Sequence, residues 1–262
     1  MLPVKIYFFE CGTLKSKKEL FTLNKDIGKP FEVPVPFYLM THNGKNILFD
    51  TGNNLEVARN PKKHWGDVIN EYYPVMNEQQ FVVNQLETLS VKPEDIDYVI
   101  LSHLHLDHAG GVGYFPNASY VVHKKELEWA FSPDCDQKSA YVMQDIDKDV
   151  NWFPLENEFE EAYDLLKDGV IKIYPTPGHT PGHMSILIDF QTSRQMFFTI
   201  DSCYTEENLN ENILSGIVWD EKKSFESMDW IRKLQKRDNM EIIVGHDPAA
   251  WKRFIKAPKY YS

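Results

Sequence analysis

Residues 96–111 read Ile-Asp-Tyr-Val-Ile-Leu-Ser-His-Leu-His-Leu-Asp-His-Ala-Gly-Gly, and this stretch decides the fold. The apolar run from Ile96 to Leu101 predicts a buried strand. Four side chains that can bind a metal follow it within six residues: His103, His105, Asp107 and His108. Each buried polar group left unsatisfied costs about 1–3 kcal/mol, and a bound metal offsets that cost. The stretch therefore predicts a metal site directly after a buried strand.

The composition is that of an ordinary globular enzyme. The chain has 262 residues, of which 42% are hydrophobic and 26% are charged. No break in composition and no low-complexity linker divides it, so we expect residues 1–262 to form a single domain. Lys and Arg number 28 against 39 Asp and Glu, a net charge of −11. We therefore expect no nucleic-acid partner, because such binding depends largely on neutralising phosphates.

The cysteines and the N-terminus bear on localisation. Cys11, Cys135 and Cys203 form no Cys-x-x-Cys pair, and an odd number of cysteines is typical of a reducing compartment. Residues 1–10 have the pattern of a first strand and lack a leader-length apolar stretch. No run reaches the roughly 18–20 apolar residues of a membrane span. We expect a cytoplasmic protein with no membrane partner.

Ligand-type side chains follow apolar runs at five places along the chain. They are Asp50, His103, His179, Asp201 and His246. In α/β proteins, binding sites gather beyond the ends of strands. The pattern therefore predicts α/β architecture with these residues at a common edge.

Local signals predict several further elements. Asn43-Gly44 between two apolar runs predicts a hairpin. Residues 13–33 lack clear periodicity and are expected to form a long loop or cap over the site. Residues 78–89 have the apolar spacing of an amphipathic helix.

The order of the motifs resembles the metallo-β-lactamase superfamily. His103-x-His105-x-Asp107-His108 is followed by His179 in a Pro-Gly-His turn, by Asp201 and by Gly245-His246. Within that superfamily the chain resembles the N-acyl-homoserine lactonases, the quorum-quenching enzymes, because Tyr204 follows Asp201 in an Asp-x-x-Tyr-Thr element typical of them. The resemblance implies an αββα sandwich with a dinuclear metal site at one edge of its two sheets.

The resemblance also implies roles for individual residues. One divalent metal would be bound by His103, His105 and His179. The other would be bound by Asp107, His108 and His246. Asp201 would bridge them with one carboxylate oxygen. Asp50 would hold the ligand loops by hydrogen bonds unless it is only a turn-former of Asp-Thr-Gly. Zinc is expected, although iron, cobalt and manganese also suit such ligands.

The implied reaction is opening of a lactone ring. A hydroxide that bridges the metals would attack the ester carbonyl of the small-molecule substrate. Tyr204 would donate its phenolic proton to the carbonyl oxygen, the alternative being a core tyrosine. Asp107 would carry a proton to the leaving alkoxide. His183, in the same turn as His179, is expected to be structural.

Several alternatives remain open on the sequence. The same site would serve another small lactone, of the γ-butyrolactone or pyridoxolactone type. A glyoxalase II-like thioesterase shares the ligands, but only residues 248–262 follow Gly245-His246-Asp247 here, too few for its C-terminal extension. A phosphodiesterase is disfavoured by the net charge, and a class B β-lactamase by Asp107 and Asp201. An oxygen- or NO-reducing di-iron protein would commonly carry Glu in place of His105.

The pocket lining and the oligomeric state are less well indicated. Taken singly, aromatic residues such as Tyr72 are assigned to the core and not to an acyl-chain pocket. Some aromatic residues of 13–37 and 53–77 are nevertheless expected to line the pocket, because no ligand comes from those segments. Some lactonases of this kind dimerise, so a homodimer through residues 13–37 or the tail 258–261 is compatible with the resemblance.

Overall fold

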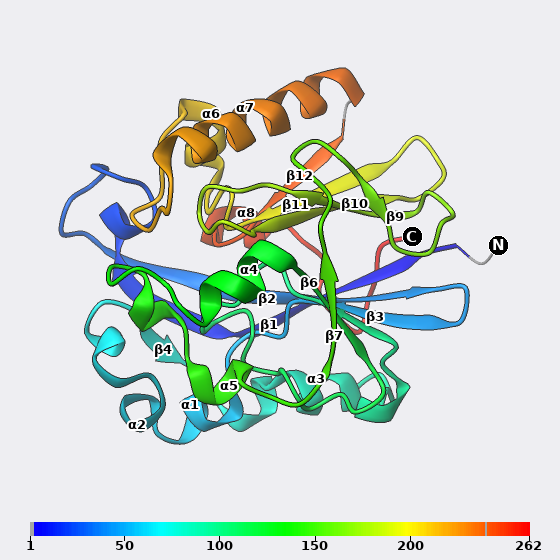
Figure 1. Ribbon diagram of the computed structural model, residues 1–262, viewed down its shortest axis with the longest axis horizontal. Coiled ribbons are helices and arrows are strands. Elements are labelled where there is room, and N and C mark those ends of the chain that lie inside the picture. Colours follow the sequence, from blue (N-terminus) through cyan, green and yellow to red (C-terminus); the bar gives the residue numbers. More distant parts are fainter. Residues whose placement is uncertain (1–2, 239) are drawn as a thin grey trace.

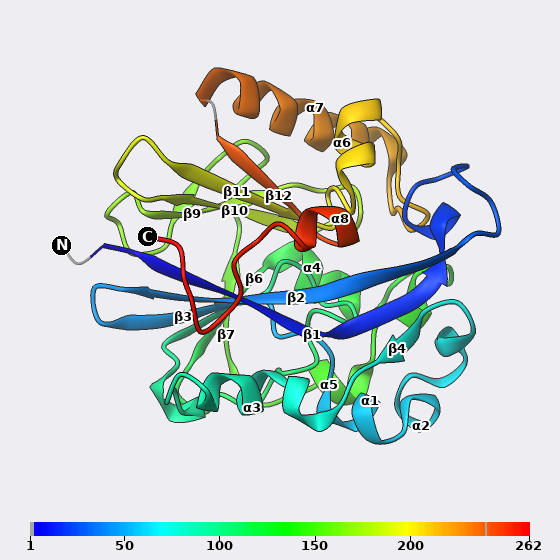
Figure 2. The ribbon, with the colours of Figure 1, turned by 180° about the vertical axis from the view of Figure 1, so that it is seen from behind.

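A computed structural model of the protein describes residues 3–238 and 240–262. Within these residues the strands form a seven-stranded sheet and a five-stranded sheet. The two sheets lie face to face, with helices on both outer faces (Figures 1 and 2). This arrangement confirms the expected α/β class and the expected αββα sandwich.

The larger sheet has the strand order β4-β1-β2-β3-β5-β6-β7. Its strands are β1 (Lys5–Lys17), β2 (Pro30–His42), β3 (Lys45–Phe49), β4 (Tyr73–Val75), β5 (Tyr98–Ile100), β6 (Ser119–His123) and β7 (Asn151–Leu155). The half from β4 to β3 is antiparallel, and β3, β5, β6 and β7 are parallel to their neighbours. The predicted hairpin is confirmed, because β2 and β3 pair with His42 opposite Lys45.

The smaller sheet has the strand order β12-β11-β10-β9-β8. Its strands are β8 (Tyr163–Asp164), β9 (Ile171–Pro175), β10 (Met184–Asp189), β11 (Gln195–Ile200) and β12 (Glu241–Val244). Strands β11 and β12 are parallel, and the other pairs are antiparallel.

The helices lie on the two outer faces and at the edges of the sandwich (Figures 1 and 2). They are α1 (Leu55–Arg59), α2 (Pro61–Trp65), α3 (Val82–Glu87), α4 (Lys124–Ala130), α5 (Met143–Ile146), α6 (Glu206–Glu211), α7 (Glu221–Asp238) and α8 (Pro248–Trp251). Short 3-10 helices are η1 (Lys18–Leu20), η2 (Gly66–Asn70), η3 (Glu78–Gln80), η4 (Pro93–Asp95) and η5 (Lys138–Ala140). Helices α6 and α7 lie against the smaller sheet, and α1, α2, α3 and α5 lie on the far side of the larger one (Figure 1). No described helix is long and apolar enough to cross a membrane.

Alternation along the strands divides the core into layers. Tyr38 and Phe198 pack between the two sheets, with ring centroids 4.8 Å apart. Their neighbours point the other way: Phe37 packs beneath the larger sheet, and Phe197 packs against Trp230 of α7. Because successive side chains of a strand face opposite sides, each sheet is buried on both faces.

The prediction of a long loop or cap over residues 13–33 was wrong at its two ends, while residues 18–29 do connect the strands and Leu20 and Phe21 do line the site. Strand β1 continues to Lys17 and pairs with β2, which begins at Pro30. The register shifts between Glu10 and Thr13, so a bulge interrupts the apolar pattern without ending the strand. Gly12 lies in this bulge at a φ of 77°, where a Cβ would meet the Cβ of Met76 at 2.5 Å. The predicted helix at 78–89 is also shorter, since η3 and α3 share that segment.

Candidate metal centre

The loops after four strands carry the predicted ligands to one place. His103, His179, Asp201 and His246 follow β5, β9, β11 and β12 respectively. Within the described part of the chain, the side chains that can hold a metal form two groups. One group is His103, His105, His179 and Asp201, and the other is Asp107, His108 and His246. In each group the ligand atoms lie within 4.8 Å of one another. The structure thus brings together all seven residues that the sequence singled out.

The carboxylate of Asp201 connects the two groups. Its Oδ2 lies 3.6 Å from Nε2 of His103 and 3.3 Å from Nε2 of His179. Its Oδ1 lies 3.4 Å from Nε2 of His108 and 3.1 Å from Nε2 of His246. A different oxygen of the carboxylate therefore faces each group, so Asp201 lies between the two groups but not through the single oxygen expected from the resemblance.

Hydrogen bonds on the far side of each imidazole decide which nitrogen carries a lone pair. A carbonyl oxygen can only accept, so His179 donates from Nδ1 to the carbonyl of Ile217 at 3.0 Å. His246 likewise donates from Nδ1 to the carbonyl of Pro34 at 2.8 Å. In the neutral rings Nε2 then carries the lone pair, and it points into the site.

The same reasoning applies to His108 and His103. His108 donates from Nδ1 to Oδ2 of Asp50 at 2.9 Å. The hydroxyl of Ser102 donates to the same oxygen of Asp50 at 2.8 Å, so His103 donates from Nδ1 to the Ser102 oxygen at 2.9 Å. Asp50 therefore orients one imidazole directly and another through Ser102.

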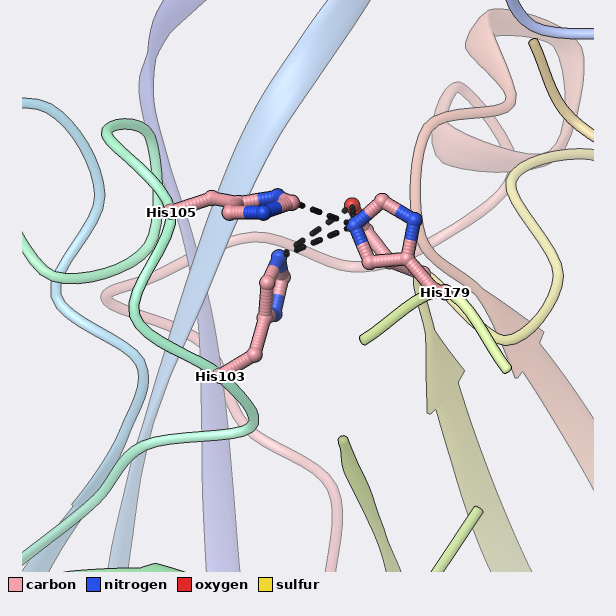
Figure 3. A group of neighbouring side chains, drawn as sticks. His103, His105 and His179 are labelled. Carbon is pink, nitrogen blue, oxygen red and sulfur yellow. Dashed lines mark hydrogen bonds and ion pairs between the residues drawn. The ribbon is translucent and has the colours of Figure 1, made fainter. Parts of the chain in front are cut away.

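These lone pairs converge on one another. Nε2 of His179 lies 3.2 Å from Nε2 of His103 and 3.0 Å from Nδ1 of His105 (Figure 3). Nε2 of His108 and Oδ1 of Asp201 are buried and have no hydrogen-bond partner among the described residues. The lone pairs of His103, His108, His179 and His246 and the carboxylate of Asp201 thus point into one site, and this set of atoms fits divalent cations, which take imidazole and carboxylate ligands.

The pKa shifts follow from burial and from the neighbouring charges. Burial lowers the pKa of His103 and of His105 well below the usual value. Burial also lowers the pKa of His108, but the nearby carboxylates of Asp201 and Asp107 outweigh it and the net shift is upward. Burial raises the pKa of Asp201, but the cationic forms of His108 and His246 outweigh it and hold the pKa well below its usual range. Positive charge at this centre is thus favoured, whether a proton or a metal supplies it.

Strained backbone delivers the bridging carboxylate. Ile200, the last residue of β11, has a φ of 45°, which is unusual for a β-branched side chain. Such strain costs about 1–3 kcal/mol and is typical of functional sites. Gly245 lies against it, because a Cβ there would meet the carbonyl oxygen of Ile200 at 2.6 Å. Gly245 thus lets the chain pack closely against Ile200, and His246 provides a metal ligand directly after it.

A buried carboxylate that the sequence reasoning missed ties the ligand loops together. Glu126 of α4 accepts hydrogen bonds from the backbone N–H of Leu104 at 3.0 Å and of Gly182 at 3.3 Å. It also accepts from the hydroxyls of Tyr141 at 3.0 Å and of Thr180 at 2.5 Å. No sequence signal marks it, because its partners come from loops far apart along the chain.

His183 has the structural role predicted for it. Its Nε2 accepts from the backbone N–H of Asp201 at 3.2 Å, and its Nδ1 lies 2.9 Å from the hydroxyl of Thr176. The imidazole therefore holds the bridging residue through its backbone.

The centre opens into a cavity of about 210 Å³. Its walls include Asp107, Asp201, Tyr204 and His246, together with apolar side chains such as Leu20, Phe21, Val68 and Ile217. The ring of Tyr204 packs edge-on against His179 and His246, with centroids 5.5 Å and 5.2 Å away. Burial and the charge of Asp201 raise the pKa of Tyr204 well above its usual value, so its hydroxyl stays protonated and can donate.

Comparisons with known proteins point to one family. A family model described as the metallo-beta-lactamase superfamily matches residues 31–246. The chain is 39% identical over 262 residues to the N-acyl homoserine lactonase AttM of Azorhizobium caulinodans, and the match covers 100% of both chains. It is 31% identical over 262 residues to an N-acyl homoserine lactonase of Bacillus thuringiensis, with 99% of this chain and 100% of that one covered.

A solved structure gives the same result. It shows an N-acyl homoserine lactone hydrolase with the product N-hexanoyl-L-homoserine bound at its catalytic metal center. The two folds match with a TM-score of 0.89 at 29% identity, over 100% of both chains. The resemblance and the fold expected from the sequence are confirmed.

Proposed function

Since this chain belongs to the metallo-β-lactamase superfamily, we propose that it is a metal-dependent hydrolase that opens the lactone ring of N-acyl homoserine lactones. The full-length similarity to lactonases of that name supports the substrate class. One observation of the site supports hydrolysis as the reaction type. Tyr204 lines the same cavity as Asp201, which joins both ligand groups. In a bacterium such an enzyme would quench quorum signals.

The proposed metal ligands are the seven converging residues. His103, His105 and His179 would hold one ion, Asp107, His108 and His246 the other, and Asp201 both. Two bound divalent ions supply a water of lowered pKa and polarise the ester carbonyl. Zinc is the proposed metal, although iron, cobalt or manganese also suit imidazole and carboxylate ligands.

Tyr204 would stabilise the charge that develops on the ester carbonyl oxygen. Its hydroxyl is buried, protonated and next to the ligands His179 and His246. A hydrogen bond from a preorganised donor is strongest where negative charge forms. The phenol thus lowers the barrier to attack on the lactone carbonyl.

Asp107 would move the proton. Its Oδ2 lies 3.6 Å from Nε2 of His108 and 3.7 Å from Nε2 of His246, and it faces the cavity. From there it accepts the proton of the attacking water and delivers it to the alkoxide oxygen that leaves the ring. The product is an N-acyl homoserine with a free carboxylate and a free hydroxyl.

We also propose the domain organisation and the location of the enzyme. Residues 1–262 would act as one domain, and the free Cys11, Cys135 and Cys203 fit a cytoplasmic location.

A homodimer would most readily form through the loop between η1 and β2, because its Ile27 is 74% exposed. The tail packs on its own chain instead, since Tyr261 pairs with Ile6. Light scattering, with Ile27→Glu as the variant, would test the dimer.

The test of the proposed function is acid release on a pH-stat with N-hexanoyl-homoserine lactone. Each ring opening liberates one carboxylic acid, so the signal reports the reaction directly. We expect release that stops when the metal is stripped with a chelator and returns with zinc or cobalt. Absence of release from protein loaded with two metals would reject the substrate class. γ-Butyrolactone and a glutathione thioester, run in parallel, would then identify the alternatives.

A further inference from the structure

A second phenol lines the cavity beside Tyr204. Tyr72 lies between η2 and β4, and its backbone N–H donates to the carbonyl of Val68 at 3.0 Å. The residue is 8% exposed and belongs to the cavity wall. Taken singly, this tyrosine was assigned to the core, although some aromatic side chains of its segment, residues 53–77, were expected to line the pocket.

The hydroxyl of Tyr72 is a donor without an acceptor. The oxygen is buried, and no hydrogen-bond partner lies within reach among residues 3–238 and 240–262. Burial, with the charges of Glu71, Asp107 and Asp201, raises the pKa of Tyr72, so the group remains a neutral donor. Buried Tyr hydroxyls usually find a partner, and leaving one unpaired costs free energy. An unpaired donor on a cavity wall therefore indicates an acceptor that arrives with the ligand.

The two phenols are neighbours in the cavity wall but differ in their contacts. Phe21 packs against both, with its ring 5.4 Å from Tyr204 and 5.9 Å from Tyr72. Tyr204 contacts the ligands His179 and His246. Tyr72 has no such ring contact with a ligand histidine in the described part of the chain. Tyr204 thus packs directly on the ligand histidines, whereas Tyr72 packs on Phe21 beside it.

The substrate has two carbonyl acceptors. The ester carbonyl must lie at the metal centre beside Tyr204, and the amide carbonyl of the acyl chain is separated from it by one ring carbon and the amide nitrogen. We propose that Tyr72 donates a hydrogen bond to the amide carbonyl oxygen of the acyl group and so selects N-acylated lactones over simple lactones. This inference rests on the proposed function, because it assigns the amide of that same substrate.

The test compares Tyr72→Phe with the wild type on two substrates. One is N-hexanoyl-homoserine lactone, and the other is a γ-alkyl lactone of similar length that has no amide. A hydrogen bond to a neutral acceptor corresponds to about a 3- to 10-fold change in binding. We expect KM for the acyl-homoserine lactone to rise by that factor with kcat nearly unchanged, and the values for the alkyl lactone to stay within about twofold. Inhibition by the product N-hexanoyl-homoserine, which keeps the amide, should weaken by the same factor.

Two controls separate this role from a structural one. Tyr73→Phe alters the adjacent tyrosine, which is 48% exposed, and should leave both substrates unaffected. The melting temperature of substrate-free Tyr72→Phe should not fall, because the variant removes an unpaired group. Equal losses on both substrates, no loss on either, or loss of bound metal would overturn the inference. If the wild type fails to hydrolyse the acyl-homoserine lactone, the proposed function itself falls, and that result is visible before any variant is compared.

Discussion

Nε2 of His103 and Nε2 of His179 lie 3.2 Å apart although each carries a lone pair. The protons of both rings are on Nδ1, where Ser102 and the carbonyl of Ile217 accept them. Two buried lone pairs at this distance repel each other unless a cation lies between them. The folded chain therefore holds an arrangement that is favourable only with positive charge in the site.

Removal of metal should lower stability as well as activity. Ligands that bind only the folded state stabilise it by about 4 kcal/mol at 1,000 times the dissociation constant. We expect the melting temperature to fall by several degrees when a chelator strips the protein, and to recover with zinc. Asp201→Ala lacks the carboxylate that faces both groups, so its melting temperature should respond little to the chelator. An unchanged melting temperature in fully stripped wild type would contradict the argument.

Tyr204→Phe should slow turnover while leaving the metals bound. Loss of one donor to a developing oxyanion typically costs 10²–10³ in kcat, or about 3–4 kcal/mol. Metal content by elemental analysis and kcat by pH-stat would be measured on the same preparation. The role assigned to the phenol would be wrong if the variant lost metal, or if kcat were unchanged.

Glu126→Gln should destabilise the fold through the ligand loops. Glu126 is fully buried and accepts four hydrogen bonds, and the amide nitrogen of Gln would face two of those donors. Each buried donor left unpaired costs about 1–3 kcal/mol, so we expect a loss of roughly 2–3 kcal/mol in urea unfolding. Glu128→Gln, on an exposed site of the same helix, is the matched control and should change stability by less than about 0.5 kcal/mol. Equal losses of stability in the two variants would show that Glu126 does not stabilise the ligand loops.

His183 should make the protein sensitive to acid. Burial, with the cationic forms of His179 and His108, lowers the pKa of His183 from 6.5 to about 3. Between those values the unfolded chain binds a proton that the folded chain does not. The free energy of unfolding is therefore not reduced by His183 above pH 6.5, and it decreases as the pH falls from 6.5 toward 3.

The measurement is urea unfolding of wild type and His183→Gln across this range. We expect the wild-type curve to fall more steeply than that of the variant, by up to about 1 kcal/mol per pH unit. Parallel curves would show that His183 does not titrate on unfolding.

The strand ends were predictable from the sequence because they depend on local pattern. An apolar run followed by a ligand-type side chain marks Asp50, His103, His179, Asp201 and His246, and the structure places each beyond a strand. The hairpin at Asn43-Gly44 has an equally local cause. These signals lie within a few residues of one another, so they need no knowledge of the fold.

Other features depend on contacts between distant segments and could not be predicted. Glu126 is distinguished from Glu128 only by the loops that surround it. Tyr72 resembles a core residue until the cavity beside Tyr204 is known. The length of β1 was missed because pairing with β2 carries the strand across the bulge at Gly12.

Asp50 connects the two halves of the centre, since it accepts from His108 and, through Ser102, orients His103. His108 belongs to one ligand group and His103 to the other. An ion that aligns either imidazole therefore prepares the other half for its own ion. The two sites should fill with positive cooperativity, and a titration of stripped protein should pass from empty to doubly loaded with little singly loaded species. Asp50→Asn should separate that titration into two steps.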